Sequence, residues 1–444
     1  MATISKSIIS AVQFLDEPSV YEALIGVRAD ERSVAEFFRM IGRSEPCMQT
    51  QNHFFVDTPL FKASTVSAFT DNSGTAMTDV TLTLDSASHG IIEGDLVMIN
   101  STDVAYVRAV TGADVQVIAI PDGTGTQNAL TVANGDTVVV LSHAAGEGSN
   151  GATARYTIPK RYEYNVQIFK ARRKITDIQN ASPIEFEWNG QNYVFYQQER
   201  EGITELMYKI SAGVLYNPAT PNHFMATTPG LTDADGNPVN VTRGLYDWVV
   251  NGGGINLGNN LTLDLAQFTT ISRELDNAGA GTQYTFLGGF DAMVAIDNTI
   301  KALNGTVLPN ARFSVDGRTV DLDLEAFSLY GRYWVKKKLN LLTLSGALGE
   351  TNKSKDFFLI PLDDAAINGG GGRVPRVSLC HFPIRVQGGV NRFWSQDQSI
   401  MMAMTGMLAP DGATNDSATI TVDYTSYQGL RVAGVEHIAW GAVA

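Results

Sequence analysis

The longest regular pattern of apolar and polar positions lies within residues 186–216. Apolar side chains recur there at steps of three, four and seven residues, the spacing of one face of an α-helix. The apolar positions are Tyr193, Tyr196, Ile203, Leu206, Met207, Ile210 and Val214. The opposite face carries Gln197, Glu199, Glu205 and Lys209. The pattern predicts an amphipathic helix over about 189–216, because Asn189 can cap its start and Asn217-Pro218 would end it.

Two glycines inside this helix indicate how it packs. Gly202 and Gly213 each cost roughly 1 kcal/mol relative to alanine in a helix interior, which favours a close neighbour or a bend at these points. At about 1.5 Å per residue the helix would be on the order of 40 Å long. We therefore interpret it as a spine that organises several strand-rich parts of the chain.

Between about 54 and 159 the period of the pattern changes to two, which is typical of half-buried strands. Five short strands are predicted, at residues 78–84, 94–100, 105–110, 114–120 and 136–142. Glycine-containing turn signals separate them, and we expect a small closed β-barrel or sandwich. We interpret the flanks, residues 61–70 and 148–158, as the two arms of an extended hairpin that carries this module at its tip.

The region from about 226 to 375 mixes helical and strand periods. Asp264 and Gln267 form a capping-box-like start for a helix that ends at Gly279, and a second helix ends at Asn304-Gly305. The apolar stripes of the two helices are Leu265, Phe268, Ile271 and Leu275, then Met293, Ile296, Ile300 and Leu303. Strands are predicted at residues 284–287, 318–338 and 356–362. Helices interleaved with strands predict a two-layer sheet domain.

The two ends of the chain complete an α+β pattern. Residues 1–55 are interpreted as an N-terminal arm, and its short helix would bury Val34, Phe37, Phe38 and Ile41. Near the other end, strands are predicted at residues 377–382, 400–407, 419–427 and 430–443. The last two are expected to form a hairpin around Gly429.

The charge of the chain limits the partners it can have. The net charge is −14 and only 18% of the residues are charged, so the chain as a whole lacks the dense lysine and arginine needed to wrap nucleic acid. Low charge with 42 glycines favours a strand- and loop-rich protein whose surface is largely covered by partners. No apolar run approaches ~20 residues and the start is too weakly apolar for a signal peptide. We therefore expect synthesis in a cytoplasm and no membrane partner.

The residues that could carry chemistry are scattered. The six histidines, none paired at helical spacing, are His53, His89, His143, His223, His381 and His437. Cys47 and Cys380 lack metal-ligand spacing and are expected to be free buried thiols rather than a disulfide. Glu199 and Glu205 are expected to form ion pairs on the helix surface.

Two acidic clusters have simpler explanations than a metal site. Residues 233–237 resemble the opening of a calcium loop, but Gly244 stands where an EF-hand places its bidentate carboxylate, so a turn is favoured. Asp321, Asp323 and Glu325 alternate on one strand face, which is either an acid/base or metal cluster or a solvated face. With no nucleotide-binding or hydrolase motif present, the sequence predicts no catalytic, cofactor-binding or metal-binding residue, and no enzyme.

One basic stretch stands out in this acidic chain. It contains Lys160, Arg161, Lys170, Arg172, Arg173 and Lys174. These residues could contact nucleic acid phosphates, or pair with an acidic face of another copy, which the net charge favours. The aromatic residues between them, Tyr162, Tyr164 and Phe169, lie at strand spacing and are expected in a core rather than stacked on bases.

Three stretches carry a resemblance to a known family. Residues 91–149, with IIEGDLVMINSTDVAYVRAVTGADVQVIAI and NGDTVVVLSHAAGEGS, look like the E-loop insertion of some phage capsid subunits. Residues 162–213, with YNVQIF and QQEREGITELMYKISAG, look like the entry to a peripheral domain, and YTSYQGLRV at 424–432 looks like the strands that close it. The chain thus resembles the major capsid proteins of tailed bacteriophages, which have the Hong Kong ninety-seven type fold. The sequence does not decide between podovirus-like and crAss-like phages as its source.

The resemblance implies a division of the chain and a set of partners. The implied parts are an N-terminal arm (1–55), an extended E-loop with an inserted small β-domain (56–159, inserted at about 78–143), a peripheral domain with the spine helix (160–225), an axial domain (226–375) and returning strands of both domains (376–444). The implied function is self-assembly as hexamers and pentamers into an icosahedral head shell around packaged double-stranded DNA, in the host bacterial cytoplasm. The implied partners are copies of the chain, a separate scaffold protein, a portal and decoration proteins, with only non-specific proximity to DNA.

Other interpretations stay open at this point. A phage tail or other virion structural protein would predict a compact trimer with fibrous repeats, whereas this sequence has no internal repeat. An encapsulin-like compartment shell would share the fold. A hydrolase would need a convergent carboxylate pair, for which Asp321 and Asp323 are the best candidates.

Overall fold

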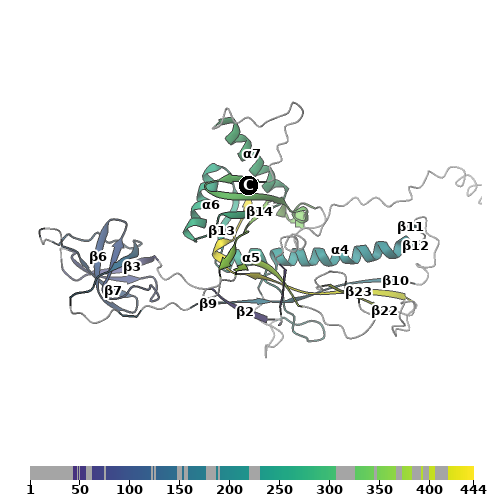
Figure 1. Cartoon of the computed structure of the whole chain (residues 1–444), viewed down its shortest axis with the longest axis horizontal. Helices are drawn as coiled ribbons and strands as arrows, with labels where there is room; N and C mark the ends of the chain where they lie inside the picture. The colour runs from purple at the N-terminus through teal and green to yellow at the C-terminus, as the bar shows by residue number, and fades with distance from the viewer. Residues whose placement is uncertain are drawn as a thin grey trace, which may run out of the picture. The chain divides into compact units, whose positions relative to one another are not determined.

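The computed structural model describes about two thirds of the chain (Figure 1). The described residues are 44–47, 49, 51–56, 63–74, 77–121, 124, 127–147, 153–154, 159–176, 187–188, 191–219, 231–306, 326–344, 348–366, 373–382, 392–393, 400–405 and 419–444. The predicted helix of the N-terminal arm and the acidic cluster Asp321, Asp323 and Glu325 lie outside them. The chain divides into two compact units, one formed by residues 54–162 and the other by residues 1–53 with 163–444.

The smaller unit contains a closed β-barrel with the strand order β3-β4-β7-β6-β5-β8. Its strands are β3 (Ser64–Asp71), β4 (Asp79–Leu84), β5 (Asp95–Ile99), β6 (Asp103–Thr111), β7 (Asp114–Ala119) and β8 (Thr137–His143). Alternate residues of each strand point inward, and Val80, Leu82, Val115 and Val117 are fully buried in its core. The five predicted strands and the closed barrel are confirmed.

The sixth strand corrects the prediction of a hairpin arm at residues 61–70. β3 belongs to the barrel, because Val66 pairs with Leu84 of β4 and Ser64 pairs with Val138 of β8. Five strands would leave two unpaired edges, and the sixth strand closes the ring between β4 and β8. Of the other predicted arm, residues 148–158, only 153–154 are described.

The barrel core is self-contained, so we predict that residues 63–147 fold when expressed alone. Thermal and urea unfolding followed by circular dichroism should each give one cooperative transition. Val117→Asp, which buries an unpaired carboxylate in the core, should abolish that transition. Arg108→Ala, on the exposed surface, should change the free energy of unfolding by less than about 0.5 kcal/mol. A fragment that shows no transition would contradict the prediction.

The larger unit contains two main sheets, of which the first carries the spine helix. Its path is β1-β20-β23-β22-β21, and β10 pairs with β23. The strands are β1 (Ser44–Pro46), β20 (Val377–His381), β23 (Thr419–Val432), β22 (Ile400–Thr405), β21 (Arg392–Phe393) and β10 (Gln167–Thr176). Two short ribbons accompany them, β2 (Gln51–Val56) with β9 (Lys160–Asn165), and β11 (Glu187–Trp188) with β12 (Gln191–Asn192).

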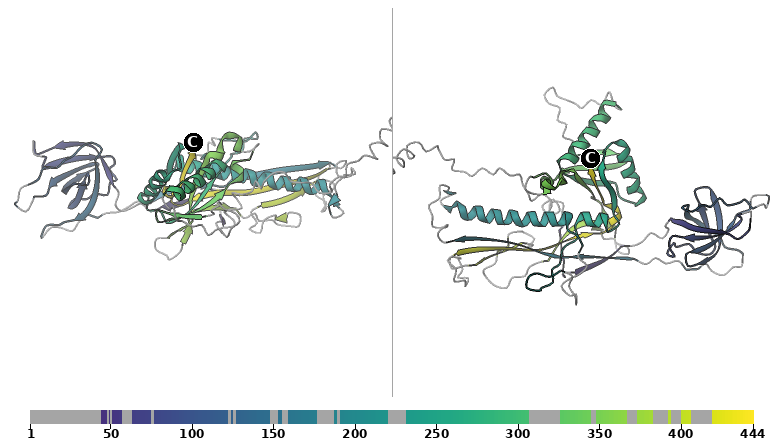
Figure 2. Two further views of the ribbon diagram at one scale, coloured as in Figure 1. Left: turned by 90° about the horizontal axis from the view of Figure 1, so that it is seen from above. Right: turned by 180° about the vertical axis from the view of Figure 1, so that it is seen from behind.

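The spine helix is α4 (Tyr193–Tyr216), which runs along β10 and β23 (Figures 1 and 2). Its predicted stripe is confirmed over the part with described side chains, where Ile203, Leu206, Met207, Ile210 and Val214 are buried. The predicted start at Asn189 is wrong, because residues 191–192 form β12 and the helix begins at Tyr193. The pairing of β11 with β12 satisfies the hydrogen-bonding groups of this backbone, which would otherwise pair within a longer helix.

The two helix glycines mark close neighbours, as expected. A Cβ atom on Gly202 would lie 2.6 Å from the ring of Tyr424 in β23, and one on Gly213 would lie 3.3 Å from the ring of Phe169 in β10. Both rings are buried. The missing side chains therefore let the helix approach the sheet closely.

The predicted hairpin around Gly429 is also wrong. β23 is one continuous strand of 14 residues that runs through Gly429, which pairs with Cys380 of β20. A Cβ atom on Gly429 would lie 2.6 Å from the carbonyl oxygen of Asn165. The glycine thus permits a close backbone approach and does not form a turn.

The second sheet has the order β13-β24-β17-β14-β16-β15. Its strands are β13 (Ile255–Leu261), β24 (Ala439–Val443), β17 (Asp356–Pro361), β14 (Gln283–Gly288), β16 (Arg332–Lys338) and β15 (Ala326–Leu329). Helices α6 (Leu265–Asn277) and α7 (Phe290–Thr306) contribute to a core on one face, where Phe268, Trp334 and Phe357 are buried. On the other face, Tyr246 of α5 (Leu245–Val250) packs edge-on against Trp440. Smaller elements are η1 (Asn340–Leu342), η2 (Leu348–Thr351), η3 (Lys353–Lys355), η4 (Val435–His437) and the pair β18 (Asp364–Ala366) with β19 (Arg373–Pro375).

The predicted elements of this part are mostly confirmed. Asp264 caps α6 by accepting a hydrogen bond from the backbone N–H of Gln267 at 2.8 Å. Gly279 follows the helix with a positive φ of 67°. The predicted strand 318–338 is wrong in its described part, residues 326–338, which forms the hairpin β15–β16 around Tyr330-Gly331. Within the described residues, no helix is both long and apolar enough to cross a membrane.

Candidate functional site

The basic stretch lies on β9 and β10, and two of its arginines pair within the chain. Arg172 binds Asp423 through two hydrogen bonds, from Nε at 2.5 Å and from Nη2 at 3.1 Å. Arg173 contacts Glu205 of α4 at 2.8 Å, and Lys209 contacts the same carboxylate at 2.6 Å. The expected helix-surface ion pair of Glu205 is confirmed, whereas the side chain of Glu199 lies outside the description. These pairs join α4, β10 and β23.

Three basic residues of β10, including the paired Arg172, share one face of the strand. Lys170, Arg172 and Lys174 are exposed, while Phe169, Ala171 and Ile175 are buried. Because Arg173 points to α4 and strand side chains alternate, the exposed row lies on the sheet face away from the helix. Its charge is reduced by Asp423, which is a poor arrangement for a dense phosphate-binding surface. Sequence reasoning missed the internal pairs because their carboxylates lie far along the chain.

The histidines occupy separate environments. His53 lies 3.5 Å from Glu163, His89 accepts a hydrogen bond from the N–H of Ile91, and His143 lies 3.2 Å from Asp95. His381 lies 3.1 Å from the Ser44 hydroxyl, His437 is in η4, and His223 lies outside the described residues. Within the described part of the chain, no group of three His, Cys, Asp or Glu residues could hold a metal ion.

The two cysteines are free and buried, as predicted, and they lie close together in the first sheet. The backbone N–H of Cys47 donates to the carbonyl of His381, the neighbour of Cys380, at 2.8 Å. Burial, and then the proximity of Cys380, raises the pKa of the Cys47 thiol to about 12. Burial also raises the pKa of Cys380. Both thiols are therefore protonated at neutral pH and are poor nucleophiles.

The calcium-like segment is a turn, as predicted. Asp233 accepts hydrogen bonds from the backbone N–H groups of Asp235 and Asn237, at 3.0 and 2.8 Å. The side chain of Asn237 lowers the pKa of Asp233 most, and these backbone bonds add to it. Gly236 has a φ of 83°, which favours glycine. The carboxylate therefore holds the loop together.

Charged side chains surround the partly buried His437, which lies in η4 just before β24. Burial lowers the pKa of His437, and Arg376 lowers it further, while Glu436 and Asp363 oppose these effects. Arg376 lies 3.5 Å from Asp363. A histidine in such a place is neutral in the folded protein at pH values where the unfolded chain binds a proton.

We predict that this histidine makes the protein less stable in mild acid. Below about pH 6.5, the ordinary histidine pKa, the unfolded state binds more protons than the folded state, so the free energy of unfolding falls as the pH falls. Urea midpoints at pH 7.5 and 5.5 should differ less in His437→Gln than in the wild type. Ser88→Ala, at an exposed position that does not titrate, serves as the control and should keep the wild-type difference. If the difference between the two urea midpoints is as large in His437→Gln as in the wild type, His437 does not cause the loss of stability in acid.

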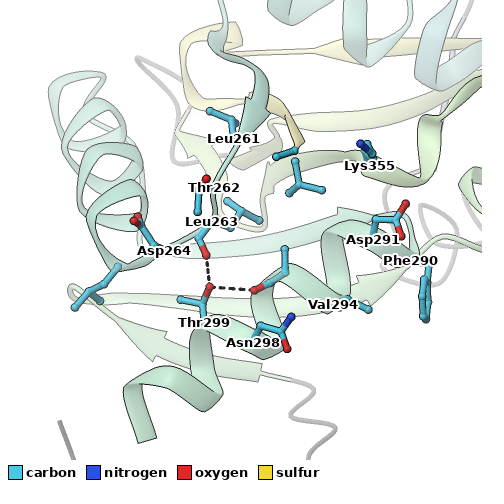
Figure 3. A pocket seen from close by; sticks show the side chains of 14 residues that line it. Leu261, Thr262, Leu263, Asp264, Phe290, Asp291, Val294, Asn298, Thr299 and Lys355 are labelled. Atoms are coloured by element: carbon cyan, nitrogen blue, oxygen red, sulfur yellow. Dashed lines mark hydrogen bonds between the residues drawn. The ribbon is translucent and has the colours of Figure 1, made fainter. Parts of the chain in front are cut away.

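An apolar groove of about 850 Å³ opens between the N-terminal ends of α6 and α7 (Figure 3). It is lined by Leu261, Thr262, Leu263, Asp264, Leu265, Phe290, Asp291, Val294, Ala295, Asn298, Thr299, Lys355, Val443 and Ala444. Leu265, Phe290 and Val294 are exposed by 36%, 49% and 39%, a high degree for large apolar side chains that lie together. No local sequence pattern indicates this groove, because its walls come from four separate segments.

The walls of the groove are held in place by hydrogen bonds. The Thr299 hydroxyl lies within hydrogen-bond reach of the carbonyls of Leu263 and Ala295, which ties α7 to the segment before α6 (Figure 3). The Ser354 hydroxyl donates to Asp291 at 2.5 Å. Asp264 is fixed as the cap of α6. The groove is therefore preformed, with two carboxylates and Lys355 among its apolar walls.

The described residues thus form a closed β-barrel, two further sheets, a long helix and a preformed apolar groove. A family model described as SU10 major capsid protein matches residues 11–325, more than half of the chain. The chain therefore belongs to the SU10 major capsid protein family.

Family membership confirms the resemblance to phage major capsid proteins and the α+β fold of the Hong Kong ninety-seven type. The protein is thus a structural component of a virion capsid and assembles with copies of itself. No curated protein matches the chain.

Solved structures similar to the chain come from phages and a bacterial compartment. A structure described as "Microbacterium phage Oxtober96" has 10% sequence identity and a TM-score of 0.46, with 98% of each chain covered. "Cyanophage A-1(L) capsid asymmetric unit" has 12% identity and a TM-score of 0.46, covering 97% of this chain and 98% of that one. The holo-SrpI encapsulin complex from Synechococcus elongatus PCC 7942 has 10% identity and a TM-score of 0.41, covering 98% and 94%. With these TM-scores below 0.5, the family assignment rests on the family model.

Proposed function

We propose that the protein forms the icosahedral head shell of a tailed phage as hexamers and pentamers around double-stranded DNA. The observation that carries the proposal is the match of the SU10 major capsid protein model to residues 11–325. The acidic net charge of −14 supports a shell that encloses DNA without clamping it. We assign the protein a structural role and no catalytic activity.

The parts of the chain have separate roles in this proposal. The barrel unit would be the insertion of an E-loop that lies over a neighbouring subunit, and residues 1–55 would form an arm that clasps adjacent subunits. The sheet with α4 would be the peripheral domain, and the sheet with α6 and α7 the axial domain. Assembly would take place in the host cytoplasm with a separate scaffold protein, a portal and decoration proteins as partners.

The internal pairing of the basic stretch bears on its role. Because Arg172 and Arg173 already pair with Asp423 and Glu205, we propose that this stretch mainly braces the peripheral domain. Lys170 and Lys174 remain exposed for contact with a neighbouring subunit.

Truncation of the arm tests the proposal. In sedimentation velocity the full chain should form fast-sedimenting assemblies, whereas a chain lacking residues 1–43 should keep its fold and sediment as small species. The circular dichroism spectrum and urea midpoint of the truncated chain provide the control for folding. Equal assembly of both chains would remove the arm from the proposal, and a full chain that forms only elongated trimers would contradict the shell function.

A further inference from the structure

The hairpin β15–β16 presents two exposed tyrosines at one edge of the second sheet. Tyr330 and Gly331 form its two-residue turn, with φ values of 51° and 73°, as in a type I′ turn. Such turns favour Asn-Gly, and a left-handed conformation is unfavourable for a residue other than glycine. Tyr330 and Tyr333 are exposed by 46% and 49%. The turn thus places a tyrosine ring in solvent at a conformational cost.

The face of β16 that carries Tyr333 also carries a lysine. Arg332 and Trp334 point toward α6, since Arg332 contacts Asp276 and Trp334 packs on Phe268. By alternation, Tyr333 and Lys337 point to the opposite face, and both are exposed. We call Tyr330, Tyr333 and Lys337 the tyrosine knob.

The tyrosine knob and the groove lie on opposite sides of the same sheet. The groove is lined by Leu261 at the end of β13 and Val443 at the end of β24, and it lies on the face covered by α6 and α7. The knob belongs to β15 and β16, toward the other end of the strand order. Lys338, at the end of β16, packs over Phe290 of the groove wall at 5.2 Å, whereas Tyr333 and Lys337 point to the other face of the sheet. A copy of the chain therefore cannot fill its own groove with its own knob.

We propose that the tyrosine knob of one copy docks in the groove of the next copy. The exposed apolar walls formed by Leu265, Phe290 and Val294 suit the tyrosine rings. Asp264 and Asp291 supply charge complementary to Lys337. Tyrosine is among the residues that dominate binding energy when buried at the centre of an interface.

This contact between copies has the geometry that a closed ring of subunits requires. A knob and a groove at different places on one molecule make a head-to-tail contact, which closes into a ring when the rotation permits. The inference rests on the proposed function, because hexamers and pentamers are such rings. It adds to that function the residues that join one axial domain to the next.

Two substitutions separate the knob from the groove in the full chain. Tyr330→Asn creates the Asn-Gly pair preferred in type I′ turns, so the hairpin should be as stable as before or more stable. Val294→Arg places a charge in the groove wall from an exposed position. Each variant alone should weaken association by about 30-fold, the loss expected for a central interface residue. Tyr330→Phe and Val294→Leu, which keep the ring and the apolar wall, are the matched controls and should assemble like the wild type.

Mixing the two variants gives the decisive result. In a 1:1 mixture, the intact knob of Val294→Arg can enter the intact groove of Tyr330→Asn, but the dimer so formed has no second working contact. Mass photometry should therefore show dimers in the mixture, no closed rings, and monomers for each variant alone. Dimers in the mixture would establish the pairing of knob with groove between copies.

The remaining outcomes overturn the inference in distinguishable ways. If the wild type and both variants assemble equally, the inference fails and the proposed function stands. If both variants fail to assemble and the mixture gives no dimers, the groove and the hairpin serve other partners and the inference also fails. If the wild type forms only elongated trimers without rings, the proposed function fails together with the inference.

Discussion

Replacing Trp334 by alanine is expected to lower the free energy of unfolding by about 3–5 kcal/mol, the range for large-to-small changes at buried aromatic positions. Trp334 is fully buried between the sheet and α6. Its ring packs against Tyr284 at 5.5 Å, Phe268 at 5.9 Å and Phe327 at 6.4 Å between ring centroids. Removing the ring leaves a cavity that these rigid neighbours cannot fill.

Urea unfolding of the wild type and the variant measures this effect. Trp334→Phe should cost less, because it keeps part of the aromatic contact. Tyr333→Ala, at the adjacent exposed position, is the matched control and should change the free energy of unfolding by less than about 1 kcal/mol. A loss below 1 kcal/mol in Trp334→Ala would show that the second sheet does not depend on this core.

Replacing Gly202 by valine is expected to lower the free energy of unfolding by about 3 kcal/mol, near the upper end for overpacked sites. A Cβ atom at this position would lie 2.6 Å from Cε2 of Tyr424 and 3.1 Å from Cγ of Arg173. Tyr424 is fully buried in β23, so its ring has little room to move. Alanine should cost less than valine, because it gains about 1 kcal/mol of helix propensity over glycine.

A double-mutant cycle tests whether the contact with Tyr424 is the cause. In the background of Tyr424→Leu, which shortens the side chain opposite the glycine, Gly202→Ala should be less destabilising than in the wild type. Lys209→Ala, which removes a surface ion pair with Glu205 and a hydrogen bond to the Lys170 carbonyl, should cost less than about 1 kcal/mol. Purely additive effects of Gly202→Ala and Tyr424→Leu would contradict a direct steric contact.

Local sequence patterns correctly predicted those helices and strands whose conformation does not depend on residues far away in the chain. The strands of the barrel follow from period two, and the buried stripe of α4 follows from helical spacing. Gly202 and Gly213 also indicated a close neighbour correctly, because a glycine inside a helix needs a packing reason.

The wrong predictions of strands and turns have a common physical cause, which is contact with residues far away in the sequence. Gly429 lies in a continuous strand because the backbone of Asn165 approaches it, and the sequence does not show that neighbour. Residues 61–70 contribute a strand because an open barrel edge needs closing. Tyr330 is an unusual residue for a turn, so Gly331 was the only sequence signal for the hairpin at 326–338, and it is a weak one.

The surfaces were harder to predict than the elements. The groove combines residues 261–265, 290–299, 355 and 443–444, and no local pattern links these segments. The basic stretch was visible in the sequence, but the pairing of Arg172 with Asp423 depends on the register between β10 and β23. The number of lysines and arginines in the sequence therefore overstated the positive charge that the folded protein offers to partners.

Negative-stain electron microscopy of the purified full chain distinguishes a capsid protein from a tail protein. We expect rings of five or six copies, tubes or closed shells. Elongated trimers without rings or shells would contradict this expectation and would indicate a tail protein.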